Sequence, residues 1–133
     1  MELVVLVVML ALLQYIFFAA QVGRARVKYG VKAPAVAGHA VFERHLRVQM
    51  NTLELLVIFI PAAFSYAVLA ERLGWYGGEV AAALGVVFLI GRGVYAKVYI
   101  QDPARRQLGF LLSFAPCLAL IAGALLAVVA TVI

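Results

Sequence analysis

The chain has 133 residues, of which 67% are hydrophobic and only 13% are charged. Because a soluble domain usually carries about 25% charged residues, this composition excludes an ordinary soluble domain and predicts a membrane protein. The net charge of +5 would suit a nucleic-acid partner, but the basic residues lie beside apolar segments, as in the connections of a membrane protein. We therefore expect membrane lipid, and no nucleic acid, as a partner.

Four apolar segments are each close to the ~20 residues that a helix needs to span a bilayer. They cover residues 3–22, 52–70, 80–100 and 108–133. Too few residues remain for a soluble domain, and no internal repeat is visible. We predict an all-α fold, a membrane four-helix bundle with four transmembrane helices, formed by residues 1–133 as a single domain.

The first apolar segment has no basic residue before it, whereas a signal peptide begins with one, so we expect the segment to be retained. Its polar side chains, Gln14 and Gln21, are expected to form hydrogen bonds between helices. The connection that follows is basic, and Arg26 lies about one turn beyond the membrane edge. Three roles are open for Arg26: a topology signal, a contact with a lipid phosphate, or part of a binding site.

Basic residues are distributed unevenly between the connections. Of eleven Lys and Arg residues, six lie between the first two apolar segments, and four lie late in the third segment or just after it. The connection between the second and third segments has one Arg and two Glu residues. By the positive-inside rule, we place the first and third connections in the cytoplasm and both termini on the opposite side.

A polar stripe leads into the second apolar segment. Four side chains share one face of a helix there, within an arc of about 80°: Glu43, Arg47, Asn51 and Glu54. An unpaired charge inside a bilayer costs at least ~2.5 kcal/mol, so the stripe needs compensation. Two interpretations are open: ion pairs within the helix and to its neighbours, or a binding site.

A second stripe lies late in the third segment, where Arg92, Tyr95 and Tyr99 fall within about 60° of one another on a helix. We expect both stripes to lie at the same depth and to form one site toward the cytoplasmic face. Arginine binds carboxylates or phosphates through its fork of donors, and a carboxylate such as Glu54 suits an ammonium group. An anionic, peptide-sized ligand with an amine would satisfy this set.

The sequence shows neither a protein nucleophile nor a metal site. No Ser or Cys lies at a readable spacing from a His, and His39, His45 and Cys117 do not form a metal-ligand pattern. Cys117 is the single cysteine, so no disulfide can form within one chain. A substrate would have to bring its own nucleophile.

These residues resemble a known family. The pattern Glu43-Arg44-x-x-Arg47-x-x-x-Asn51-x-x-Glu54, followed by Arg92-x-x-Tyr95-x-x-x-Tyr99 and then Arg106, is similar to the MAPEG superfamily, the membrane-associated proteins of eicosanoid and glutathione metabolism. The resemblance covers nearly the whole chain and is closest to the microsomal glutathione transferases and the leukotriene-forming synthase branch. It implies a homotrimer that binds glutathione, as co-substrate, between neighbouring subunits.

The resemblance also implies roles for the matching residues. Arg106 would be the catalytic residue that stabilises the glutathione thiolate, because a nearby cation lowers the pKa of a thiol. Gln49 falls on the opposite side of its helix from Asn51, so a ligand or another subunit would have to wrap around that helix. The residues implied to bind glutathione are Arg26, Arg47, Gln49, Asn51, Glu54, Arg92, Tyr95 and Tyr99.

Two positions depart from the leukotriene-forming branch: Val27 stands where that branch has a second arginine, and Leu55 where it has a tyrosine. We therefore expect a broader activity, the conjugation of glutathione to hydrophobic or lipid-derived electrophiles, with reduction of lipid hydroperoxides as a further reaction. A non-catalytic lipid-binding scaffold of the same superfamily is the alternative. A small transporter or proton-coupled module is a third class, which only Glu54 supports.

Overall fold

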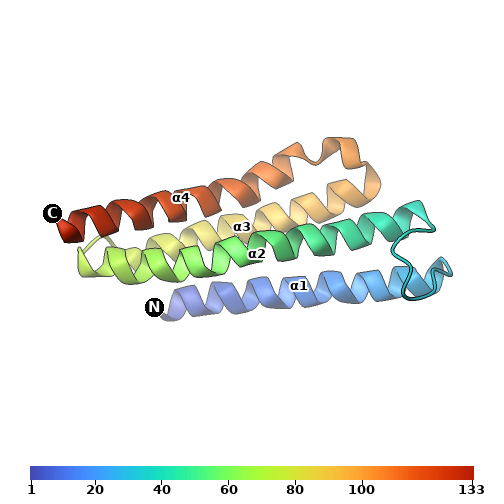
Figure 1. Cartoon of the computed structure of the whole chain (residues 1–133), viewed down its shortest axis with the longest axis horizontal. Helices are drawn as coiled ribbons and strands as arrows, with labels where there is room; N and C mark the ends of the chain where they lie inside the picture. The colour runs from blue at the N-terminus through green and yellow to red at the C-terminus, as the bar shows by residue number, and fades with distance from the viewer.

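The computed structural model describes all 133 residues. It contains four α-helices and one short 3₁₀ helix: α1 (Glu2–Lys28), α2 (Ala40–Arg72), α3 (Gly77–Gln101), η1 (Pro103–Arg105) and α4 (Gln107–Val132). Each long helix runs opposite to the one before it, so both termini lie at the end of the bundle that also holds the α2–α3 turn (Figure 1). The α1–α2 and α3–α4 connections lie together at the other end.

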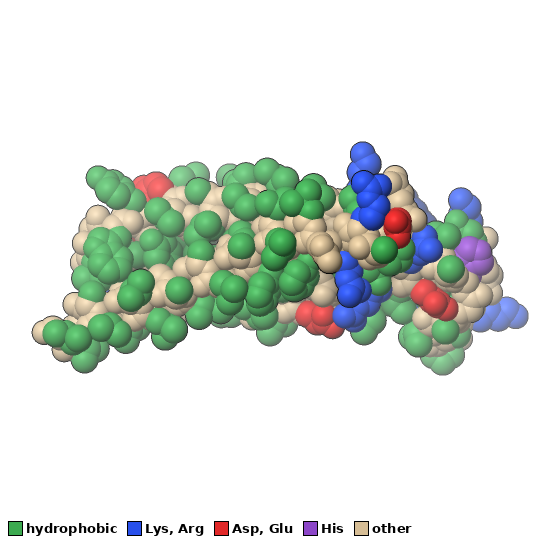
Figure 2. All heavy atoms as spheres, turned by 90° about the horizontal axis from the view of Figure 1, so that it is seen from above, with side chains coloured by type: hydrophobic (Ala, Val, Ile, Leu, Met, Phe, Trp, Pro, Cys, Tyr) green, Lys and Arg blue, Asp and Glu red, His purple; other side chains and the backbone are tan.

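The outside of the bundle is suited to lipid. All four α-helices are long and apolar enough to cross a membrane, and large hydrophobic side chains are exposed along them, among them Leu13, Ile16, Val57 and Leu125. Figure 2 shows hydrophobic side chains over most of the length, whereas Lys and Arg gather at the end that holds the α1–α2 and α3–α4 connections. We call this the basic end. The predicted all-α fold with four membrane-spanning helices is confirmed.

The centre of the bundle is formed by α2 and α3, because each packs against both α1 and α4. Phe59 of α2 and Phe88 of α3 are fully buried and stack with their ring centroids 4.3 Å apart. Gln14 of α1 donates a hydrogen bond from Nε2 to the Leu89 carbonyl oxygen of α3 at 3.0 Å, which is the interhelical bond expected for this glutamine. Further side chains complete the core: Val4, Val7, Val8, Cys117 and Leu120.

The start of α2 is held by side chains that accept backbone hydrogen bonds. His39 Nδ1 accepts from the Val41 N–H at 3.2 Å, and Glu43 Oε1 accepts from the Gly38 N–H at 2.9 Å. The N–H groups of the first helical turn have no partner within the helix, so such caps stabilise its beginning. Glu43, the first residue of the predicted polar stripe, instead ties the connection that precedes α2 to the first turns of its own helix.

Helices α3 and α4 approach each other closely at two glycines. A Cβ atom on Gly109 of α4 would lie 2.5 Å from the Cα atom of Tyr95 in α3, and one on Gly91 of α3 would lie 2.7 Å from the Leu112 carbonyl carbon in α4. Carbon atoms in contact normally stay about 3.5–4.0 Å apart, so only glycine permits this spacing. As a result, α4 lies directly against the part of α3 that carries Tyr95.

Candidate functional site

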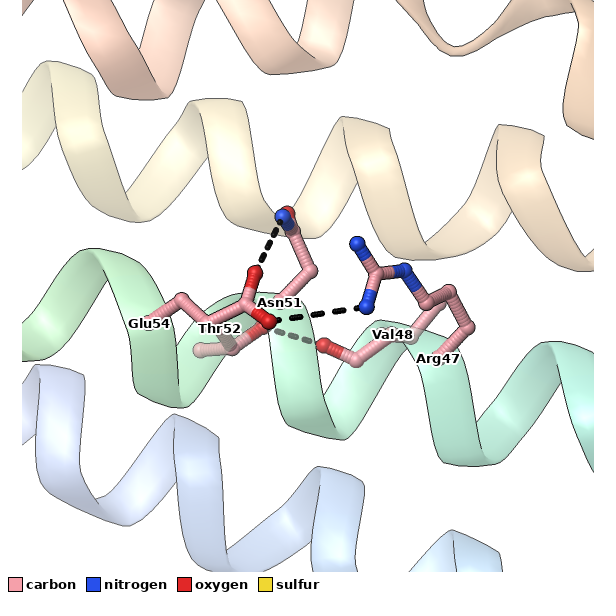
Figure 3. Close-up of polar contacts among 5 residues, drawn as sticks. All are labelled: Arg47, Val48, Asn51, Thr52 and Glu54. Carbon is pink, nitrogen blue, oxygen red and sulfur yellow. Dashed lines mark hydrogen bonds and ion pairs between the residues drawn. The ribbon is translucent and has the colours of Figure 1, made fainter. Parts of the chain in front are cut away.

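Three polar side chains of α2 form a connected group. The Glu54 carboxylate accepts hydrogen bonds from Asn51 Nδ2 at 3.2 Å and from Arg47 Nη1 at 3.5 Å (Figure 3). Figure 3 shows the carboxylate lying between the other two side chains on one face of the helix. The Arg47 and Glu54 side chains are 48% and 55% exposed, and an ion pair as exposed as this contributes only ~0–1 kcal/mol to stability. This pairing therefore explains little of why charges occupy this face.

A hollow with a volume of about 280 Å³ lies beside this polar group. Its walls come from three helices and one connection: Arg47 and Asn51 of α2, Tyr95 of α3, Phe110 of α4, and Arg106 between η1 and α4. The structure thus brings the two predicted stripes and the predicted catalytic arginine to one place. We call this space the arginine hollow.

A second hollow of about 390 Å³ shares Arg47 with the arginine hollow. It lies against η1 and is also lined by Glu43, Arg44 and Tyr99. Tyr99 stacks on Tyr95 with ring centroids 5.2 Å apart, so the two tyrosines connect the walls of both hollows. Together these spaces offer three arginines and two tyrosine rings at the basic end of the bundle.

Arg44 has a role that the sequence analysis did not assign. Its Nη1 donates hydrogen bonds to the carbonyl oxygens of Ile100 and Gln101, at 3.0 and 3.1 Å. These are carbonyls of the last turn of α3, which have no partner within their own helix, so Arg44 joins α2 to the end of α3. Its position three residues before Arg47 was the only available signal, because its partners lie more than fifty residues away.

Arg92 lies behind the arginine hollow instead of lining it. It is fully buried, and its guanidinium carbon lies 4.2 Å from the centre of the Tyr95 ring. None of its three guanidinium nitrogens has a hydrogen-bond partner in the chain. A cation over an aromatic face is attracted to it, so within one chain Arg92 packs against the Tyr95 ring.

Arg26 and Gln49 do not reach the arginine hollow. Arg26 Nη1 donates to the carbonyl oxygens of Ala35 and Val31, at 2.8 and 3.3 Å, which ties the α1–α2 connection to α1. Gln49 Nε2 donates to the Tyr15 hydroxyl of α1 at 2.8 Å. Within one chain, neither side chain lines the arginine hollow, and Gln49 is directed to α1.

The chemistry available in the arginine hollow is recognition of anions. Arg47 and Arg106 supply guanidinium donors, which match carboxylates in a bidentate geometry. Glu54 and the tyrosine hydroxyls can pair with an ammonium or peptide group of the same ligand. No group of three His, Cys, Asp or Glu side chains is placed to hold a metal ion, and Cys117 is buried, with Sγ directed to the Ser113 carbonyl oxygen at 3.3 Å.

The structure shows four helices suited to a membrane and, at their basic end, a hollow lined by two arginines. Comparison with known families makes this more specific, because the MAPEG family matches residues 4–126. The chain belongs to the MAPEG family. This confirms the resemblance on which the site residues were assigned.

Individual relatives point to one branch of the family. The chain is 42% identical over 123 residues to an uncharacterised protein of Synechocystis, covering 92% of this chain and 85% of that one. It is 42% identical over 101 residues to human microsomal glutathione S-transferase 2, covering 75% of this chain and 64% of that protein. The mouse protein of the same name is 39% identical over 106 residues, covering 79% and 67%. The chain thus spans about two thirds of the length of these transferases.

Proposed function

We propose that this protein is a membrane-bound glutathione transferase that joins the glutathione sulfur to hydrophobic or lipid-derived electrophiles. The observation that carries the proposal is the arginine hollow, in which Arg47 and Asn51 of α2, Tyr95 of α3 and Arg106 before α4 meet from three parts of the chain. The similarity to proteins named microsomal glutathione S-transferase 2 supports glutathione as the co-substrate. Since none of the side chains that line the hollow is a Ser or Cys nucleophile, the thiol of glutathione is the nucleophile of the reaction.

Arg106 is the residue we assign to the chemical step. At neutral pH, only about 3% of a thiol with a pKa of ~8.5 is ionised, and the thiolate is the nucleophile. A guanidinium beside the sulfur favours the anion, and each unit by which the thiol pKa falls corresponds to ~1.4 kcal/mol. Arg106 is exposed and lines the hollow, and its side chain forms no hydrogen bond or ion pair within the chain, so its guanidinium is free for the ligand. The same thiolate would also reduce a lipid hydroperoxide.

The remaining residues would bind and orient glutathione. Arg47 suits a carboxylate of the tripeptide, and Glu54 suits its ammonium group. Asn51 can accept a hydrogen bond from a peptide N–H of the ligand, because its Oδ1 is buried without a hydrogen-bond partner. Tyr99 borders the neighbouring hollow, and Arg92 contributes by supporting Tyr95. Glutathione binding is also proposed for Arg26 of α1 and Gln49 of α2, which lie outside the arginine hollow.

The test compares three alanine variants of the purified, detergent-solubilised protein. Arg106→Ala should lower turnover with a chromogenic aryl halide by on the order of 10²-fold, as for loss of a donor that stabilises developing charge, and leave much of glutathione binding intact. Arg47→Ala should instead weaken binding by about 10–100-fold, because a hydrogen bond to a charged group contributes ~1.5–3 kcal/mol. Arg105→Ala is the control, since Arg105 is exposed at the same end and lines neither hollow.

The direct measurement is the ultraviolet absorbance of the bound thiolate, titrated against pH. The parent protein should show a glutathione thiol pKa below that of free glutathione, so its thiolate persists to lower pH. In Arg106→Ala this pKa should return toward the free value, whereas Arg105→Ala should match the parent. An unchanged pKa in Arg106→Ala would show that Arg106 is a lipid or topology residue, and the assignment of the chemical step would be wrong.

We further infer that residues 1–133 work as one domain and assemble as a homotrimer. The support is geometric: Arg26 contacts the α1–α2 connection and Gln49 contacts Tyr15 of α1, and neither lines the arginine hollow, so we expect one ligand to contact them together with that hollow between two copies. The charge distribution supports a site toward the cytoplasmic face and both termini on the other side. Native mass spectrometry in a mild detergent should show trimers; a monomer that retains full activity would refute the assembly.

A further inference from the structure

The α1–α3 side of the bundle carries an apolar hollow that the proposed transferase site does not use. Its volume is about 310 Å³, and five of its ten lining residues are aromatic or aliphatic: Phe17, Phe18, Val48, Ala96 and Ile100. Lys97 of α3, which is exposed, also lines it. None of these residues lines the arginine hollow. At Gly93 the wall has no side chain, and a Cβ atom there would meet only Gln14 Nε2, at 3.8 Å. We call this space the α1–α3 hollow.

A smaller basic hollow adjoins it. This one has a volume of about 250 Å³ and is lined by Arg24, Lys28 and Tyr29 of the α1 end of the chain. Gln21 and His45 line both spaces, so the two hollows meet at these side chains. No Asp or Glu lines either hollow.

The two cations of the basic hollow have no acidic partner in the chain. Arg24 and Lys28 are exposed, and the ion pairs of the chain join Met1 to Glu2 and Arg47 to Glu54. Lys28 follows Arg24 by four positions, which places the two side chains on the same face of α1. A ligand with a negative charge would therefore be met by two cations at once.

The order of these groups along α1 matches the depth profile of a lipid. Arg24 and Lys28 lie in the last turns of α1, at the basic end, whereas Gln14 is ten residues earlier and about 15 Å deeper at 1.5 Å per residue. Going inward from the basic end along α1, a ligand would meet Arg24 and Lys28, then the amide of Gln21 beside the imidazole of His45, then the rings of Phe18 and Phe17. A phospholipid presents a phosphate, then ester groups, then an acyl chain in the same order.

We propose that the basic and α1–α3 hollows together bind one anionic phospholipid of the surrounding membrane. Its phosphate lies between Arg24 and Lys28, since guanidinium and ammonium groups are the usual partners of phosphate. Its ester groups lie near Gln21 and His45, and one acyl chain occupies the α1–α3 hollow. A free fatty acid fits less well, because its carboxylate joins the chain directly and leaves the two intervening polar side chains without partners.

The test is a lipid titration of the purified full chain, followed by native mass spectrometry, with phosphatidylglycerol and phosphatidylcholine as probes. The parent should bind one phosphatidylglycerol in preference to phosphatidylcholine. The double variant Arg24→Gln/Lys28→Gln should lose this preference, with affinity for phosphatidylglycerol lower by on the order of tenfold. The control Lys32→Gln/Arg105→Gln removes the same charge at the same end, but neither residue lines these hollows, so it should behave as the parent.

A second pair of variants tests the acyl-chain part. Gly93→Leu places a side chain into the α1–α3 hollow without a close contact at its Cβ, so it should weaken binding of both lipids and keep the preference for phosphatidylglycerol. Gly23→Leu is its control, because Gly23 is exposed on α1, has no atom within 4 Å of a Cβ and lines neither hollow. Both substitutions add the same side chain to a helix.

Three outcomes would overturn the proposal. One is equal loss of lipid preference in the two charge variants, which would indicate a general attraction between the basic end and anionic lipid. Another is unchanged binding in Gly93→Leu, which would leave the α1–α3 hollow empty. The third is displacement of the bound lipid by oleate at lower concentration than by phosphatidylglycerol, which would make a fatty acid the occupant. None of these measurements depends on glutathione, so they stand apart from the test of the transferase.

Discussion

Replacing Gly109 by alanine should disturb both the packing of α3 on α4 and the arginine hollow. The new Cβ atom would lie 2.5 Å from the Tyr95 Cα atom and 2.8 Å from its Cβ atom. Because carbon atoms in contact need about 3.5 Å, the two helices would have to separate locally by about 1 Å. Tyr95 is buried and lines the hollow, so the displacement acts directly on a wall of the site.

The expected magnitude combines two opposing effects. Inserting a methyl group into a closely packed contact costs about 1–3 kcal/mol, whereas alanine is favoured over glycine inside a helix by ~0.8–1.0 kcal/mol. The net loss should therefore be up to about 2 kcal/mol. For a chain of this size, 1 kcal/mol corresponds to about 3–6 °C in the melting temperature, so Gly109→Ala should melt several degrees below the parent.

Thermal unfolding in detergent and glutathione titration measure the two effects separately. Gly23→Ala is the control, since no atom lies within 4 Å of a Cβ at Gly23; it should keep or raise the melting temperature and leave the affinity for glutathione unchanged. Gly109→Ala should lower both the melting temperature and the affinity for glutathione. If Gly109→Ala has the same melting temperature and the same affinity for glutathione as the parent, the close approach of α4 to Tyr95 does not shape the hollow.

Two further predictions concern buried charge and orientation. Arg92→Met removes a fully buried cation without hydrogen-bond partners, so the free energy of unfolding should be unchanged or higher by up to ~4 kcal/mol. Glutathione should bind more weakly, because Tyr95 loses the group that lies 4.2 Å from its ring centre. A lower melting temperature would contradict the first expectation. Reporters fused after Ile133 or at Trp75 should read non-cytoplasmic and one at Lys32 cytoplasmic. The opposite pattern would reverse the proposed orientation of the site.

Much of the architecture was predictable because it depends on properties that are local along the chain. Hydropathy over about 20 residues reports a membrane span, and the four spans correspond to the four α-helices. The angle of about 100° per residue reports which side chains share a face of a helix, and it placed Arg47, Asn51 and Glu54 together, as observed. The spacing of these residues also led to the MAPEG family, which the match over residues 4–126 confirms.

The partners of each side chain were decided only by the tertiary structure. The sequence could not show that Arg106 and Asn51 line one hollow, that Arg92 lies behind Tyr95, or that Arg44 joins α2 to the end of α3. These contacts depend on how far each helix is rotated about its axis and how closely it approaches the next. That distance is set where Gly91 and Gly109 meet the backbone of the facing helix, and the periodicity of one helix carries no information about the surface of another.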